Sequence, residues 1–591
     1  MVKRLETIFD NKIWAKITSV LFPILLVLFS LIHIGEGVTV TDTGYNYGNF
    51  VSFDGLDDMW KFSTYLASAI GAFFTHLPFG QTMIGLNFYT GLFKILAALI
   101  LYYFCINVCK MRKEVVFIGE MIALGLCWCP TALIYNYLTY FLFHMAAIFL
   151  YMAIVKEKKV FYILAGVSLG INLFVRLPNL AEIALIAVVF IAGILYKKGI
   201  KKVVSDTLYC VLGYIIGAGA IFVYIVCRYG LKRYVDGIMS LFAMTDEAGS
   251  YTVKAMIMDT LRVYIQYSKW FIFGVLLVVG GLLLFKILED KFVLAKKCIF
   301  VALMVALVYL FLKMGMFTLN YRGYESIFGW GVMLLTVCLF LGAGIILSKR
   351  RSNEEKVMAC IVCVIILITP LGSNNHLYSP MNNLFLVAPF FINYIWQLIS
   401  CEKRSMMLGK ISINLSAYKI AFVLLACVIF VQSFLFGLNF VFRDGVGGED
   451  REYQISNNPV LSNMYTTREN GENLQQLNDY LVKNDLIGSD AVLFGNVPSL
   501  AFYFELNPVL SSTWPDLSSY SVDKFKTEID RLSKEDAMPM VLLSANPSDT
   551  GQTDSSSNSL KEKMQYLQSF MEEKQYECVF TNEAFMLYIN K

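Results

Sequence analysis

The chain has 591 residues, of which 57% are hydrophobic and 16% are charged. Soluble globular proteins carry about 25% charged residues, so this composition excludes a wholly soluble fold, whose surface could not hide so much apolar area from water. The net charge of +4 is divided unevenly, because residues 442–591 contain 12 Lys/Arg against 23 Asp/Glu (−11), which leaves 37 against 22 (+15) in residues 1–441.

This division is typical of a membrane domain, expected at 1–441, followed by an acidic soluble domain, expected at 442–591. The basic residues form short clusters at the ends of apolar runs, which does not indicate a nucleic-acid partner. Most of the 13 Cys lie inside the apolar runs, where they are expected to pack as small apolar residues. No His or Cys cluster has the spacing of a metal site.

Apolar runs long enough to cross about 30 Å of hydrocarbon predict thirteen transmembrane helices. The first run has no small-residue cleavage site after it, so we expect a retained helix rather than a signal peptide. The runs cover residues 14–36, 83–107, 115–133, 138–155, 160–176, 181–196, 205–227, 270–287, 297–314, 327–347, 357–371, 383–400 and 419–441. Ionisable residues are expected to gather at the ends of these runs.

Basic clusters follow the apolar runs in strict alternation, at the N-terminus and in every second loop. By the positive-inside rule this side is predicted to be cytoplasmic, in a multi-pass protein of the plasma (inner) membrane. With an odd number of spans, the C-terminal domain is then predicted to be extracytoplasmic. The clusters lie at residues 3–4, 110–113, 156–159, 197–202, 286–297, 349–351 and 403–419.

The first predicted external loop, residues 37–81, contains the sequence Thr41-Asp42-Thr43-Gly44-Tyr45 just after the first span. An acid at that depth beside a phenol such as Tyr45 could act as a general base in a cleft at the membrane surface. The alternative is a solvated Asp that only ends the helix. Residues 59–74 predict an amphipathic helix at the interface. Asp54, Asp57 and Asp58 either supply a second acid or cap this helix, and capping is the expected role.

Further polar residues are predicted on the same external side. Asn136 and Tyr137, in a tight turn between two spans, are candidates to line the same cleft. Arg176 lies at the outer end of a span with Asn179 close behind it. An Arg beside hydrocarbon is costly unless it pairs, meets an anion or snorkels to lipid phosphate, so Arg176 is either a substrate contact or a lipid contact.

Two later external loops carry the remaining candidates. Arg322 and Glu325 form a charged cluster that could contact substrate or simply pair internally. Asn374, Asn375 and His376 form the second cluster. A lone external His is more often a hydrogen-bonded loop residue than a catalyst. Carboxylate, cations and amides on one face would suit a reaction on a lipid-phosphate substrate.

The C-terminal domain alternates short strands and helices, which predicts a small α/β layer. Strands are expected at 491–494, 540–543 and, with less regular patterning, 509–511, and a hairpin at 576–580 and 585–589. Helices are expected at 496–504, 522–533 and 560–574. The stretch 544–559 is rich in Ser, Asn, Asp and Gly and is expected to be a flexible loop.

The long first loop with its acid, the thirteen spans and the α/β tail resemble the GT-C superfamily of membrane glycosyltransferases, in particular protein O-mannosyltransferases, aminoarabinose transferases and their uncharacterised bacterial relatives. The resemblance implies a polytopic α-helical fold, an inverting reaction, a polyprenyl-phosphate-linked sugar as donor and Asp42 as the base. Carried over to this chain, it would make Arg176 and Arg322 phosphate contacts, an assignment based on their charge and topology rather than on a motif match. Many members have two adjacent acids, whereas Thr43 follows Asp42 here, so a second-acid or metal-binding role is in doubt.

Two other functions remain open. A transporter or lipid flippase would need polar residues at mid-membrane depth and broken helices. A non-catalytic assembly or sensor protein of the cell envelope would depend on the tail and not on Asp42. For the glycosyltransferase, the sugar, the acceptor (glycan, lipid or protein) and the need for a divalent metal remain open as well.

Overall fold

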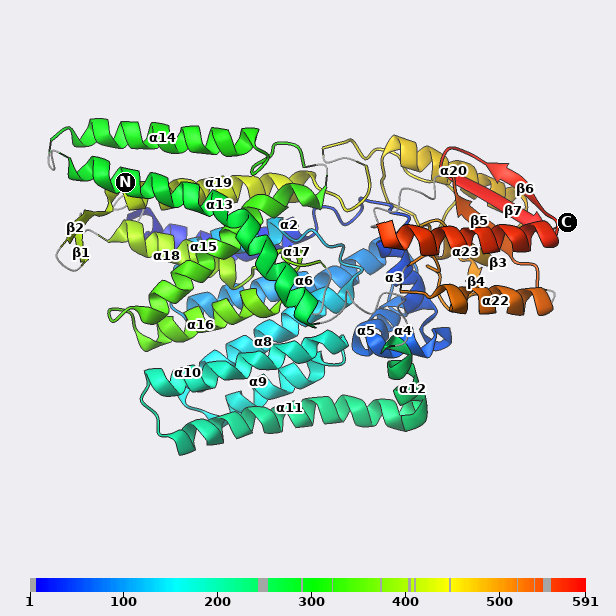
Figure 1. Cartoon of the computed structure of the whole chain (residues 1–591), viewed down its shortest axis with the longest axis horizontal. Helices are drawn as coiled ribbons and strands as arrows, with labels where there is room; N and C mark the ends of the chain where they lie inside the picture. The colour runs from blue at the N-terminus through cyan, green and yellow to red at the C-terminus, as the bar shows by residue number, and fades with distance from the viewer. Residues whose placement is uncertain are drawn as a thin grey trace.

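The computed structural model describes residues 7–242, 253–287, 291–321, 323–371, 375–401, 405–408, 411–445, 448–517, 519–535, 537–545 and 554–590. A bundle of long helices fills one part of the molecule and a smaller α/β domain caps one end of it (Figure 1). The N-terminus lies at the opposite end from the C-terminus. The fold is therefore the predicted polytopic helical domain with a C-terminal α/β domain.

Nine helical segments of the described residues are long and apolar enough to cross a membrane. They are α2 (Lys12–Ser30), α6 (Met83–Asn107), α8 (Ile134–Lys156), η2 with α10 (Leu177–Ile186, Ala187–Leu195), α11 (Ile200–Tyr229), α13 (Val253–Lys286), α14 (Val293–Lys313), η3 with α15 (Tyr324–Ile327, Phe328–Leu347) and α19 (Leu415–Asn439).

The other four predicted spans form shorter helices of 13 to 16 residues. They are α7 (Lys113–Gly125), α9 (Lys159–Asn172), α16 (Asn353–Ile368) and α18 (Val387–Ser400). Each of the thirteen predicted segments is thus helical, while the number that crosses the bilayer stays a prediction.

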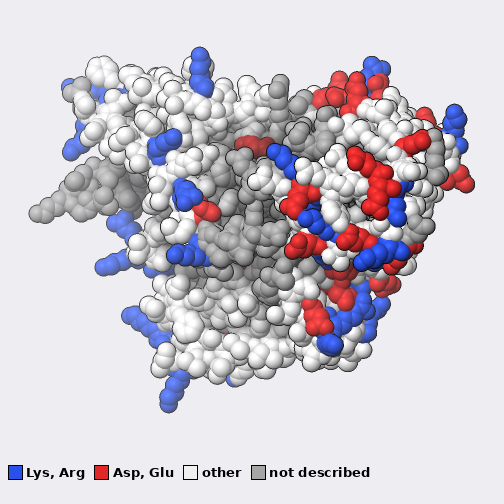
Figure 2. Space-filling view, turned by 45° about the vertical axis from the view of Figure 1, so that its right-hand side comes forward, with Lys and Arg blue, Asp and Glu red and all other residues white. Residues whose placement is uncertain are grey.

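Charge is distributed along the molecule as the sequence predicts. Figure 2 shows Lys and Arg side chains at the free end of the bundle, whereas Asp and Glu gather on the C-terminal domain. The hairpin of β1 (Ser405–Leu408) and β2 (Ile411–Asn414), which falls in one of the basic loops, lies at that free end (Figure 1). The pattern agrees with the positive-inside rule, and the orientation itself stays a prediction.

Close helix packing in the bundle depends on small residues. A Cβ atom on Gly166 of α9 would lie 2.0 Å from the carbonyl oxygen of Cys210, and one on Gly213 of α11 would lie 2.0 Å from that of Ile163. Gly170 and Gly217, four residues on, are equally enclosed. Two facing Gly-x-x-x-Gly pairs therefore let the α9 and α11 backbones touch, as is common in membranes.

The first loop is more helical than predicted. It forms α3 (Asp42–Val51), η1 (Phe53–Gly55), α4 (Asp58–Ser63) and α5 (Tyr65–Thr75), which lie where the bundle meets the C-terminal domain (Figure 1). The predicted single helix at 59–74 is wrong, because the chain breaks at Thr64 between α4 and α5. The expected cap is confirmed at Asp57, whose carboxylate accepts the Met59 N–H at 3.0 Å. The helix α12 (Leu231–Phe242) packs against α4, and the short helix α17 (Tyr378–Met381) precedes α18.

The C-terminal domain is built on a five-stranded sheet with the order β4-β3-β5-β7-β6. The strand β3 is parallel to β4 and β5, whereas β7 is antiparallel to β5 and β6. The strands are β3 (Asp490–Phe494), β4 (Asn507–Pro508), β5 (Met540–Ser544), β6 (Tyr576–Thr581) and β7 (Phe585–Asn590), and the helices are α20 (Arg468–Lys483), α21 (Leu500–Tyr503), α22 (Val522–Lys534) and α23 (Asp554–Glu573).

Alternation along β3 divides the core of this domain in two. Ala491 and Leu493 face a core shared with α20, α21 and the first loop, whereas Val492 and Phe494 face a core formed with α22 and α23. Successive side chains of a strand point to opposite faces, so both faces of the sheet must be covered. The face toward the first loop joins the domain to the bundle.

Several local predictions for this domain need correction. The helix α20 was not predicted, the region 509–511 is not a strand, and the helix expected at 496–504 is limited to α21. The helix α23 begins at Asp554, so the expected flexible loop does not reach residue 559, and its residues 546–553 lie outside the described chain.

Candidate functional site

The segment that leads into Asp42 is held along its length by the C-terminal domain. The Ser499 N–H donates to the carbonyl of Val40 at 3.0 Å, and the Ser499 hydroxyl donates to that of Thr41 at 2.5 Å. The Tyr503 hydroxyl donates to the carbonyl of Thr39 at 2.5 Å. Asp42 is therefore positioned by contacts from a part of the chain more than 450 residues away.

Asp42 is the first residue of α3 and lines a cavity of about 480 Å³ between the first loop, the bundle and the C-terminal domain. Arg443, which follows the last helix of the bundle, lies 3.3 Å from its carboxylate, and the Thr41 hydroxyl donates to the same oxygen at 3.3 Å. The side chains of Asp42 and Arg443 keep 25% and 44% of their surface exposed, so both remain accessible to a ligand.

The environment of Asp42 acts on its charge in opposite directions. Burial raises the pKa of the carboxyl, while the Arg443 charge and the Thr41 hydroxyl lower it by less. The net result is a raised pKa, which makes the carboxylate a stronger base than an ordinary surface Asp. Like the Arg443 charge, the position of Asp42 at a helix N-terminus opposes the effect of burial and favours the ionised carboxylate.

One face of α3 is turned to the cavity. Asp42, Tyr45, Asn46 and Asn49 all line it, and their spacing of three, one and three residues is that of a single helical stripe. The opposite face carries Gly44 and Tyr47, which pack against the C-terminal domain.

The C-terminal domain completes the cavity wall with Asn496, Trp514 and Leu517. The Tyr45 and Trp514 rings meet edge to face, with centroids 5.4 Å apart. The loop that carries Trp514 is anchored by Asp516, which accepts the Asn496 N–H at 2.6 Å. Burial raises the pKa of Asp516 to about 6. The domain therefore forms part of the site rather than only covering it.

Arg176 lies in a second, buried polar network. Its guanidinium donates to Asn179 at 2.8 Å and to Asn136 at 3.3 Å, and only 8% of the residue is exposed. Arg176 Nη2 has no hydrogen-bond partner among the residues that the structure describes. Asn136 directly follows Tyr135, which lines the cavity of Asp42, so this network adjoins the Asp42 site. The predicted trio of Asn136, Arg176 and Asn179 is thus together, but none of the three lines the 480 Å³ cavity.

The other predicted residues lie apart from Asp42. Tyr137 is buried and donates to the Cys129 carbonyl at 2.6 Å. Glu325 is exposed, Asn375 is exposed, and His376 is half-buried with a left-handed φ of 43°. None of these four lines the 480 Å³ cavity. Arg322 and Asn374 lie outside the described residues. Of the predicted binding residues that the structure describes, Tyr45 is the one that shares the cavity with Asp42.

Sequence reasoning missed Arg443, Tyr135 and Trp514, which all line the cavity. A signal existed for Arg443, since it is the first cation after the last predicted span, on the side where the positive-inside rule makes cations rare. No local pattern marks Trp514, which belongs to an irregular loop.

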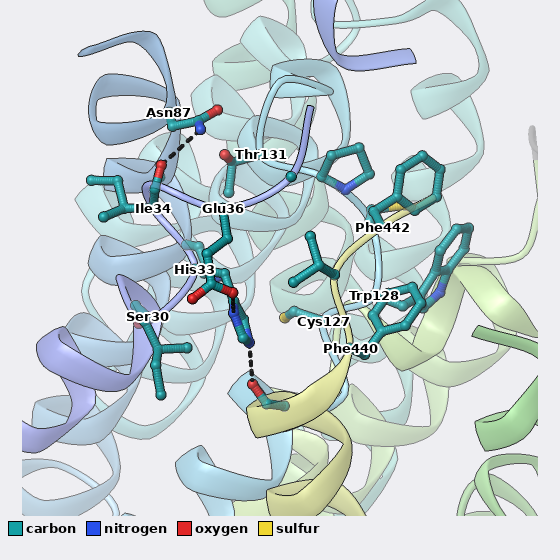
Figure 3. Close-up of a pocket in the computed structure, with 18 of the residues that line it drawn as sticks. Ser30, His33, Ile34, Glu36, Asn87, Cys127, Trp128, Thr131, Phe440 and Phe442 are labelled. Atoms are coloured by element: carbon teal, nitrogen blue, oxygen red, sulfur yellow. Dashed lines mark hydrogen bonds and ion pairs between the residues drawn. The ribbon is translucent and has the colours of Figure 1, made fainter. Parts of the chain in front are cut away.

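A smaller cavity of about 130 Å³ is lined by residues of the first loop, including Thr39 and Thr43, and by residues of α6 and α19; Figure 3 shows part of its lining. His33 pairs with Glu36 at 2.9 Å and contacts the Gly437 carbonyl at 3.0 Å, while the Asn87 amide donates to the Ile34 carbonyl at 2.9 Å. Lys94 also lines this cavity from the interior of α6. The expectation that ionisable groups lie only at helix ends is therefore wrong for Lys94.

The residues around Asp42 do not fit a resident divalent metal. Asp42 is the one carboxylate among the described residues that line its cavity, and its nearest charged neighbour is a cation. The described part of the chain holds no group of three His, Cys, Asp or Glu side chains arranged to bind a metal ion. Divalent cations prefer several anionic oxygen ligands, and a guanidinium 3.3 Å away opposes them.

No protein-family model and no curated protein matches this chain. Solved structures do resemble it. The Archaeoglobus fulgidus oligosaccharyltransferase in complex with Zn and sulfate is 12% identical, with a TM-score of 0.44, over 96% of this chain and 73% of that one. The A. fulgidus oligosaccharyltransferase AglB with an inhibitory peptide and a dolichol-phosphate is 12% identical, with a TM-score of 0.41, over 96% and 74%.

Arabinosyltransferase EmbB from Mycobacterium smegmatis is 9% identical, with a TM-score of 0.36, over 70% of this chain and 37% of that one. AglB and EmbB are both membrane glycosyltransferases of the GT-C superfamily, the group that the sequence resembles. With TM-scores below 0.5, a function for this chain has to rest on its own site.

Proposed function

We propose that this protein is a membrane glycosyltransferase that moves a sugar from a polyprenyl-phosphate donor to an acceptor hydroxyl, with inversion at the anomeric carbon. The observation that carries the proposal is the pairing of Asp42 with Arg443 in the 480 Å³ cavity, at the end of the helical bundle where the C-terminal domain sits. A base and a cation side by side supply what an attacking hydroxyl and a departing phosphate each require.

In the reaction, the acceptor oxygen forms a bond to the anomeric carbon on the face opposite the phosphate. The carboxylate of Asp42 takes the hydroxyl proton as that bond forms. The bond between the anomeric carbon and the phosphate oxygen breaks, and its electron pair leaves with polyprenyl phosphate. Attack from the opposite face inverts the anomeric centre, and the polyprenyl chain stays in the bilayer beside the bundle.

The surroundings of Asp42 favour this role. Burial raises the pKa of Asp42 and so increases its strength as a base, while the Arg443 charge opposes part of this rise. Arg443 is also the nearest described cation that could stabilise the negative charge gained by the phosphate. Arg176 does not line the cavity, but it donates to Asn136, the residue after the cavity-lining Tyr135, and its charge would support the same phosphate at longer range.

The test is donor turnover by the full chain in nanodiscs, with polyprenyl-phosphate-linked sugars as donors, an extract of cell-envelope glycans as acceptor, and release of polyprenyl phosphate measured by mass spectrometry. Asp42→Asn is expected to slow turnover about 10²- to 10⁴-fold, which is the usual contribution of a general base. Asp54→Asn is the matched control, because Asp54 belongs to the same loop and its side chain is 86% exposed. Full activity of Asp42→Asn, or no turnover of any donor by the wild type, would overturn the proposal.

A transporter or flippase is the second candidate, and one observation favours it. Glu120 of α7 is fully buried in the bundle, and neither of its carboxylate oxygens has a hydrogen-bond partner among the described residues. Lys94 lies within α6. Intramembrane ionisable groups of this kind often mark a transport path. That reading predicts that Glu120→Gln stops movement of a fluorescent polyprenyl phosphate across liposomes, whereas Asp42→Asn does not.

A further inference from the structure

Another cavity, of about 470 Å³, lies between the first loop and the C-terminal domain, and it is called the second cavity below. Four residues, Tyr45, Asn49, Leu56 and Trp60, line both this cavity and the one that holds Asp42. The two spaces therefore adjoin across the α3 and α4 side chains. An elongated ligand that fills the second cavity would present its end to Asp42.

The lining of the second cavity combines polar, aromatic and apolar side chains with two carboxylates, Asp57 and Glu505. Tyr45 and Trp60 supply rings, and amide and hydroxyl side chains supply hydrogen bonds: Asn49, Ser52, Gln81, Asn507, Ser511, Ser512 and Thr513. No Lys or Arg of the described chain lines it, so it does not suit a phosphate or another anion. A lipid tail would cover these polar side chains without replacing their hydrogen bonds to water, which is unfavourable.

Two buried polar atoms at this cavity point to an absent hydrogen-bonding ligand. Trp60 Nε1 and Thr513 Oγ1 are both buried and have no hydrogen-bond partner within the described ranges of the chain. Buried donors of this kind are rare in native proteins because they lose water without compensation. The two residues come from opposite walls, the first loop and the C-terminal domain, so one ligand between the walls would contact both side chains.

The wall supplied by the C-terminal domain is rigid. Glu528 accepts both the Ser511 N–H, at 2.7 Å, and the Ser511 hydroxyl, at 2.6 Å. The buried ammonium of Lys563 donates to the carbonyls of Pro515 and Leu517, each at 2.9 Å. Residues 511–517 are thus fixed at both ends, and a preorganised wall lowers the entropic cost of binding.

We propose that the acceptor is a neutral glycan chain, which binds in this second cavity and extends its terminal hydroxyl to Asp42. The inference rests on the glycosyltransferase activity proposed above. Sugar rings present C–H faces that stack on Tyr45 and Trp60, and hydroxyls that match the amide and hydroxyl side chains of the lining. A peptide fits less well, because the neighbouring edge strand β4 has only two residues and one is Pro508, which lacks an N–H for pairing with an added strand.

The test measures binding to full-length Asp42→Asn in nanodiscs, since this variant cannot consume the acceptor. The probes are an array of neutral oligosaccharides of four to six sugars and an array of hydroxyl-containing peptides of similar size. Oligosaccharides are expected to bind, and Trp60→Ala and Thr513→Ala are each expected to weaken binding at least tenfold. Trp60→Phe, which keeps a ring and loses the N–H, is expected to fall between Trp60→Ala and the parent. Thr527→Ala, at an exposed position of the same domain, is the matched control and is expected to bind within twofold of the parent.

The possible outcomes separate this inference from the proposed function. Binding of peptides but not oligosaccharides would overturn the glycan acceptor and leave the glycosyltransferase intact. Donor turnover by the wild type without oligosaccharide binding, or binding that Trp60→Ala and Thr513→Ala leave unchanged, would also overturn the site. Oligosaccharide binding without any donor turnover would keep the glycan site and overturn the transfer reaction. Thermal unfolding of each variant shows whether a loss of binding reflects a loss of fold.

Discussion

Gly44 lies where α3 crosses α21, and its replacement by alanine tests whether the C-terminal domain holds Asp42 in place. A Cβ atom at this position would lie 2.5 Å from Ser499 Cβ and 2.9 Å from Ser499 Cα. Non-bonded carbons settle at about 3.5–4.0 Å, so the two helices would have to separate by roughly 1 Å. Overpacking of this kind costs about 1–3 kcal/mol.

Gly48, one helical turn further along α3, provides the control for stability. A Cβ atom there would meet Phe502 Cβ at 3.7 Å, which is an ordinary contact. Both Gly→Ala changes gain up to about 1 kcal/mol of helix propensity. Because that gain cancels in the comparison, Gly44→Ala is expected to be less stable than Gly48→Ala by about 1–3 kcal/mol, the cost of the clash alone.

The assay is thermal unfolding of the full chain in detergent, followed by tryptophan fluorescence, with donor turnover measured in parallel. A shift of about 1 Å at Asp42 is expected to lower turnover by Gly44→Ala about 10²-fold relative to the wild type. If Gly44→Ala proved as stable as Gly48→Ala and kept wild-type turnover, the close approach of α3 to Ser499 would have no role in positioning Asp42.

Three further predictions concern charge. The acidic limb of the kcat/KM profile is expected above the ordinary carboxyl pKa of about 3.9, because burial raises the pKa of Asp42. Arg443→Gln removes a charge that lowers this pKa, so it should move the limb to still higher pH. A pH–rate titration that finds the limb unmoved in Arg443→Gln would contradict the assignment of Asp42 as the base. The pKa of Asp516 in the folded protein, about 6, exceeds the unfolded value, so its contribution to stability is full below about pH 4 and is lost as pH rises through 6. Between pH 4 and 7 the free energy of unfolding of the wild type should therefore fall by an amount on the order of 3 kcal/mol that is absent in Asp516→Asn. Arg451 pairs with Asp444 at 3.3 Å, and both side chains are buried. Arg451→Met would leave the Asp444 charge buried and unpaired, so it should lower the free energy of unfolding by about 3–5 kcal/mol and lower the unfolding temperature. An unfolding temperature equal to that of the wild type would show that the pair is not buried in solution.

Elements with a regular apolar pattern were predicted closely. The helix α22 and the terminal hairpin of β6 and β7 lie within a residue or two of their expected positions. The helices α3 and α20 were missed because each contains Gly and Asn, which disfavour a helix in isolation. Both form through packing: Gly44 and Tyr47 of α3 meet the C-terminal domain, and Leu474, Leu477 and Leu481 of α20 fill the shared core. Tertiary contacts stabilise these helices more than their own propensity does.

The amino-acid sequence alone determined that the chain enters a membrane and which of its loops are basic. It also determined that an acidic α/β domain follows and that Asp42 belongs to the long first loop. Those features are local, since hydropathy, charge and periodicity are properties of short windows. Only the tertiary structure decided what stands beside Asp42. Arg443 is 401 positions away, and Trp514 lies in a loop with no regular pattern. Contacts of that range depend on how a shared core brings the first loop and the C-terminal domain together, and no short stretch of sequence contains that information.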